Sequence, residues 1–128
     1  MPIEAADSMM IAYRKLYIIE TSLRYVIQER MLEEYGPHWE FRASLQYLKR
    51  PSKSFHDMNL HELLNYFNTY PPLQKIFTAK QKVQLSHLTS IRNKIAHCKK
   101  LDNKEAQFLS ELELCVKKVI NSKILSTF

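Results

Sequence analysis

The chain has 128 residues, of which 45% are hydrophobic and 25% charged, and a single glycine, Gly36. This length fits one domain, and the composition excludes a disordered chain. With one glycine, the chain lacks the tight turns of an all-β fold and a glycine-rich phosphate loop. A net charge of +6 favours a polyanionic partner such as RNA or DNA, although a solvated basic surface would produce the same excess.

The pattern over residues 8–34 predicts a long helix. Its apolar residues recur at alternating spacings of three and four and so share one face: Met9, Ala12, Leu16, Ile19, Leu23 and Val26. Tyr13 and Tyr17 are expected to widen this apolar stripe, and Ser8 is the expected N-cap. Gly36, followed by a proline, ends the helix.

Residues 38–58 show no regular period. Several apolar side chains in this segment are expected to fold back on the core: Trp39, Phe41, Leu45, Tyr47 and Leu48. Residues 50–54 read as an exposed basic loop.

The remaining sequence predicts four more helices, so that the whole chain, residues 1–128, forms one all-α domain, a bundle of about five helices. The first three of these cover residues 59–69, 73–78 and 80–97, and the last is capped by Asp102 or Asn103. Cys98 and Cys115 fall on apolar stripes and are expected to be buried. Neither has a CxxC partner, so no zinc site is predicted.

Nothing in the sequence indicates a membrane or an export signal. The first seven residues are acidic and carry no apolar segment of the signal-peptide type. No apolar run is long enough to cross a bilayer. We therefore expect a cytoplasmic, reduced protein with no membrane partner.

The residues best suited to chemistry lie near the end of the helix predicted over 80–97. A rotation of about 100° per residue places Arg92, Asn93 and His97 away from the apolar stripe, with Ala96 among them. Histidine exchanges protons near neutral pH, and arginine binds a phosphate through two N–H groups. The small Ala96 would allow a second copy of the chain to approach closely. From spacing alone, a histidine at a helix end can also be a simple cap.

Residues 92–97, Arg-Asn-Lys-Ile-Ala-His, resemble the Arg-polar-x3-His motif of the HEPN superfamily, the higher-eukaryote and prokaryote nucleotide-binding domains. Residues 19–24 are similar to the first helix of many bacterial members. Many HEPN domains are metal-independent ribonucleases that act as dimers, in which two motifs form one composite site. The resemblance therefore implies an all-α HEPN-like fold, a symmetric dimer, and Arg92, Asn93 and His97 as the catalytic residues.

Three further residues are candidates for a supporting role. Glu20 matches an acidic position on the first helix of HEPN domains, although a surface pair with Arg24, four residues later, would explain it equally well. Lys99 and Lys100 directly follow the motif and can hold a phosphate backbone, or can be a solvated helix end. One subgroup of HEPN toxins has a tyrosine at the position of Lys99, so control through modification of that tyrosine is not expected here.

The leading hypothesis is a homodimeric, metal-independent endoribonuclease, a toxin or phage-defence effector, that cleaves RNA through its 2′-hydroxyl. The partners would be RNA, a second copy of the chain and an antitoxin or regulatory protein. The alternatives are a non-catalytic HEPN module that dimerises or binds a nucleotide, RNA or protein, and a basic RNA-binding domain. No cofactor or metal is expected, because His56, His61 and His87 have no partners at metal-ligand spacing.

Overall fold

The computed structural model describes residues 2–46 and 53–125, and every regular element in them is helical. The elements in chain order are α1 (Pro2–Tyr35), α2 (Trp39–Gln46), the 3-10 helix η1 (Phe55–Asp57), α3 (Leu60–Thr69), α4 (Pro71–Gln74), α5 (Ala79–Ala96) and α6 (Asn103–Leu125). The predicted all-α fold is confirmed. Of the predicted basic loop 50–54, only Lys53 and Ser54 lie within the described residues, and both are exposed.

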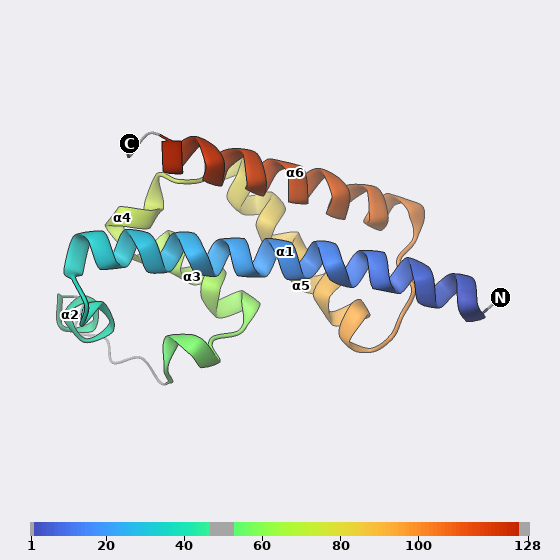
Figure 1. Cartoon of the computed structure of the whole chain (residues 1–128), viewed down its shortest axis with the longest axis horizontal. Coiled ribbons are helices and arrows are strands. Elements are labelled where there is room, and N and C mark those ends of the chain that lie inside the picture. Colours follow the sequence, from blue (N-terminus) through green and yellow to red (C-terminus); the bar gives the residue numbers. More distant parts are fainter. Residues whose placement is uncertain (1, 47–52, 126–128) are drawn as a thin grey trace.

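The long helix α1 organises the molecule. Figure 1 shows α6 lying beside α1 and running in the same direction, while α5 crosses behind α1. The Lys15 ammonium on α1 donates a hydrogen bond to the Ser110 hydroxyl on α6. The side of α1 that faces the other helices carries the stripe predicted from the sequence, with Ala12, Leu16, Ile19, Leu23 and Val26 all buried. This packing holds the end of α5 against the first half of α1.

The first helix starts earlier than predicted. It begins at Pro2, so Ser8 lies within the helix and is not its N-cap. Proline is favoured in the first turn of a helix because the N–H it lacks would have no helical partner there. Glu4, in the same turn, complements the positive end of the helix dipole.

The segment predicted to be irregular contains a helix, α2, and the short η1. Trp39 is buried and makes edge-to-face contacts with the rings of Phe55 and Tyr66, as its apolar character predicted. Phe41 and Leu45 are exposed, so the prediction that they join the core is wrong. They lie on the outer side of α2, because a helix this short buries only one face. Tyr47 and Leu48, for which the same was predicted, lie outside the described residues.

The predicted helix over 73–78 is also displaced. Pro71 and Pro72 occupy the first positions of α4, which ends at Gln74, and do not merely terminate α3. Thr78 instead caps α5, since its hydroxyl accepts a hydrogen bond from the Gln81 N–H. Among the described residues, no helix is both long and apolar enough to span a membrane.

Candidate active site at the end of α5

Helix α5 presents the Arg-Asn-His motif on its outer surface. Its inner stripe, Leu85, Leu88 and Ile91, is buried in the core. The side chains of Arg92, Asn93, Ala96 and His97 are all exposed, as the rotation of a helix requires when Ile91 points inward. Three groups suited to binding and cleaving a phosphodiester are thus accessible from solvent.

The helix ends in a way that fixes the position of His97. This residue is the C-cap, and its backbone N–H donates to the Asn93 carbonyl. Two further hydrogen bonds close the turn, from the Cys98 N–H to the Ile95 carbonyl and from the Lys99 N–H to the Lys94 carbonyl. This pair of bonds defines a Schellman motif, in which the residue after the C-cap adopts a left-handed conformation.

Cys98 occupies that left-handed position, with φ of 57°. Its side chain is exposed, which contradicts the predicted burial, and Cys115 is only half-buried. The reason is that the helical period stops at the C-cap, so a position that would continue the apolar stripe turns outward instead.

The turn after the motif is also tied to α6. The Lys94 ammonium forms an ion pair with the Glu105 carboxylate, and this hydrogen bond raises the pKa of Lys94 above its usual value. Glu105 in addition accepts a hydrogen bond from the Asp102 N–H, and Asp102 caps α6 by accepting from the Glu105 N–H. The predicted cap at Asp102 is therefore confirmed. Together these contacts fix both ends of the segment that contains His97, Lys99 and Lys100.

An open hollow of about 240 Å³ lies where α1 crosses α5. Tyr13, Tyr17 and Glu20 line it from α1, and Arg92 and Ala96 line it from α5. The rings of Tyr13 and Tyr17 stack with their centroids 6.4 Å apart. A guanidinium, a carboxylate and two phenol rings thus surround one small opening, with Ala96 leaving space for a ligand or another surface.

The structure separates Glu20 from Arg24. The Arg24 guanidinium donates to the backbone carbonyls of Phe55 and Met58 and lies 5.9 Å from the centre of the Phe55 ring. Among the described residues no ion pair joins it to Glu20, so the predicted surface pair is wrong. The backbone carbonyls beside η1 compete successfully for Arg24 because they are close to α1 and need donors. Glu20 remains directed toward the hollow that contains Arg92.

The other predicted site residues lie around this hollow but outside its lining. Asn93 and His97 are exposed on the neighbouring strip of α5, and Lys99 and Lys100 are exposed in the connection to α6. From the sequence, Tyr13 and Tyr17 belong to an aromatic set that could stack bases, but their helical spacing favours the widened apolar stripe of α1; that assignment is wrong, since both rings are exposed and line the hollow. A helical wheel of α1 could have predicted this exposure, because both tyrosines lie about 100° or more from the centre of the apolar stripe.

A scan against protein-family models places the chain in a known group. The model for the Swt1-like HEPN family matches residues 14–116, which is most of the chain and includes α1 from Arg14 onward and the motif at the end of α5.

The chain belongs to the Swt1-like HEPN family.

Membership in the HEPN superfamily is thus shown, and it suggests either a ribonuclease or a nucleotide-binding module. No curated protein and no solved structure matches the chain. Within the described residues, no group of three or more His, Cys, Asp or Glu side chains is arranged to hold a metal ion.

Proposed function

We propose that this HEPN domain is an endoribonuclease that works as a homodimer and needs no metal ion. The observation that carries the proposal is the exposure of Arg92, Asn93 and His97 on one fixed helix end, beside a hollow into which Arg92 projects. These residue types supply a phosphate-binding fork, an orienting amide and a proton-transfer group.

The proposed reaction uses the substrate's own nucleophile. His97 removes the proton from the RNA 2′-hydroxyl, whose oxygen then attacks the adjacent phosphorus, and the bond to the 5′-oxygen breaks. The His97 of a second copy, or water, returns a proton to the leaving 5′-oxygen. Arg92 stabilises the negative charge that builds on the phosphate. The products are a 2′,3′-cyclic phosphate and a free 5′-hydroxyl.

Glu20 and the lysines have supporting places in this proposal. Glu20 lies in the hollow with Arg92 and can orient its guanidinium once a substrate is bound. Lys99 and Lys100 are exposed directly after His97 and can contact the flanking phosphates of the RNA. A toxin or phage-defence effector held in check by an antitoxin or regulatory protein is the biological role that such an activity fits.

The alternative function is a HEPN module that binds RNA or a nucleotide without cutting it. The stacked and exposed rings of Tyr13 and Tyr17 support this alternative, since they offer accessible aromatic surfaces on which the bases of RNA or a nucleotide can stack without any cleavage.

Incubation of the pure protein with end-labelled RNA separates the two functions. We expect the wild type to cleave and His97→Ala to lose roughly a hundredfold or more in rate, the usual range for a general acid or base. His38→Ala is the matched control, because His38 is also exposed but lies between α1 and α2. Equal binding by the wild type and His97→Ala, with no cleavage by either, would establish the binding module instead.

A further inference from the structure

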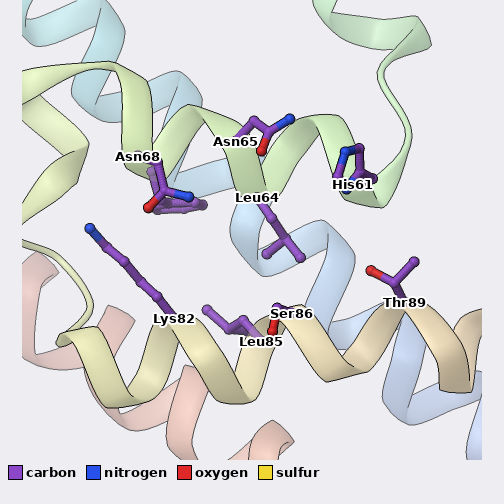
Figure 2. Close-up of a pocket in the computed structure, with 9 residues that line it drawn as sticks. His61, Leu64, Asn65, Asn68, Lys82, Leu85, Ser86 and Thr89 are labelled. Atoms are coloured by element: carbon purple, nitrogen blue, oxygen red, sulfur yellow. The ribbon is translucent and has the colours of Figure 1, made fainter.

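A second hollow, of about 120 Å³, lies on another side of α5, between this helix and α3. Figure 2 shows Leu64 of α3 and Leu85 of α5 facing each other inside it, while Lys82 reaches from α5 toward Asn68. Phe67 and Leu85 are fully buried and form its apolar floor.

Polar groups with free hydrogen-bonding capacity surround that floor. Asn65 and Asn68 are exposed on α3, and their backbone carbonyls accept hydrogen bonds from the Thr69 hydroxyl and the Gln74 side-chain amide, respectively. Within the described part of the chain, neither side-chain amide has a protein partner. Each amide therefore offers a donor and an acceptor side by side to a ligand.

The two ends of the hollow differ in chemistry. At one end the exposed imidazole of His61 is available to stack on a flat ring. At the other end the Lys82 ammonium donates to the Gln74 carbonyl at 2.9 Å and keeps its positive charge beside the opening. These groups together match a nucleotide. The apolar floor and the His61 ring can contact the faces of a base, the two side-chain amides can pair with its edge, and the Lys82 ammonium can contact its phosphate.

This hollow is aligned with the catalytic motif. One side of α5 carries residues of both the hollow and the motif, at spacings of three or four and within about 80° of one another around the helix: Lys82, Ser86, Thr89, Asn93 and His97. Thr89 precedes His97 by about 12 Å along the helix axis, at 1.5 Å per residue. An RNA strand whose scissile phosphate lies at His97 can therefore follow this side of α5 to the α3–α5 hollow within a few nucleotides.

We propose that the α3–α5 hollow binds one unpaired base of the RNA and thereby sets the sequence preference of cleavage. The inference rests on the proposed function, from which it takes RNA as the ligand and His97 as the place of cleavage. Sequence-specific recognition of RNA generally uses unstacked bases, whose edges pair with side-chain amides. The hollow thus supplies base recognition, whereas the motif at the end of α5 contacts the phosphate and the 2′-hydroxyl.

Binding of labelled RNA homopolymers of A, C and U to His97→Ala tests this inference without cleavage. We expect the tightest and weakest homopolymers to differ by about tenfold or more in Kd, the discrimination that amide–base pairs provide. Replacing both Asn65 and Asn68 by alanine should reduce that difference to less than about threefold. Asn121→Ala, at an exposed asparagine of α6, is the matched control and should retain it.

The outcomes distinguish this inference from the proposed function. Unchanged discrimination in the Asn65→Ala, Asn68→Ala double variant would overturn the base site, even if the wild type cleaves RNA. Amide-dependent discrimination by a protein that never cleaves RNA would support the base site and overturn the nuclease proposal. Failure to bind any homopolymer would overturn both.

Discussion

Cys98 adopts a backbone conformation that costs free energy for any residue with a Cβ atom. Its φ of 57° is the only positive value of a non-glycine residue in the described part of the chain. The left-handed region costs an L-residue about 1–2 kcal/mol, and glycine is the usual occupant of this position in a Schellman motif. The hydrogen bonds of the Schellman motif and the Lys94–Glu105 ion pair hold the turn in this conformation.

We predict that Cys98→Gly stabilises the protein. The relief of strain outweighs the added entropy of glycine in the unfolded chain, so the free energy of unfolding should rise by roughly 0.5–1 kcal/mol, a few degrees in Tm. Thermal denaturation checks this. Cys98→Ala keeps the Cβ atom and should show no such gain; an equal gain in both variants would attribute the effect to the thiol.

At the level of single residues, the sequence predicted exposure best inside regular helix. The 100° rotation correctly placed Arg92, Asn93 and His97 on the surface, because Ile91 is held inward by the core. The same rule failed for Cys98, which lies just beyond the C-cap, where the helical period no longer applies. The catalytic roles of Arg92, Asn93 and His97 stay a prediction, since a catalytic side chain must be exposed to substrate but an exposed side chain need not be catalytic.

Arg24 joins two elements that the sequence did not predict to be in contact. It extends from α1 to the carbonyls on both sides of η1, which Glu40 of α2 also anchors by accepting from the Phe55 N–H at 2.8 Å. We predict that Arg24→Ala lowers the free energy of unfolding by about 2 kcal/mol, because two buried carbonyls lose charged donors.

Chemical denaturation measures this loss, with Arg14→Ala as the control. Arg14 is an exposed arginine of the same helix and should change stability by less than about 0.5 kcal/mol. Equal effects of the two substitutions would show that Arg24 has no special structural role.

The helices that the sequence predicted best are those with a long apolar stripe. The inner residues of α1, α3 and α5 repeat over several turns, and so their burial followed from spacing. Helix α2 has only two turns and α4 only one, too few for a period to be recognised. The hollow between α1 and α5 depends on a crossing of distant segments, which no local pattern encodes.

For the whole molecule, the exposed surface beside the motif favours association of two copies. One side of α1 carries four exposed hydrophobic residues at spacings of three, four and seven: Ile3, Met10, Tyr13 and Tyr17. Between 58% and 73% of the surface of each residue is exposed to solvent. Methionine and tyrosine are enriched in protein interfaces. This side of α1 lies next to Arg92 and Ala96, so a symmetric dimer through it would bring two motifs together.

We predict a dimer at micromolar concentration in sedimentation experiments, and a loss of roughly tenfold or more in association for Met10→Lys, because a charge would be buried without a partner. Val83→Lys is the control, because Val83 is similarly exposed but lies about 180° from Arg92 around α5. A monomer that cleaves RNA at full rate would contradict the composite site.

The proposed mechanism is tested most directly by whether cleavage at a defined position requires the 2′-hydroxyl there. The experiment compares an RNA oligonucleotide with the same oligonucleotide carrying a single 2′-deoxy sugar at the cut, both in excess EDTA. Because the proposed nucleophile is the 2′-hydroxyl and the proposed proton acceptor is His97, we expect cleavage of the first oligonucleotide alone, with a 2′,3′-cyclic phosphate product. Cleavage of both substrates at equal rates, or complete loss of activity in EDTA, would contradict the proposed mechanism.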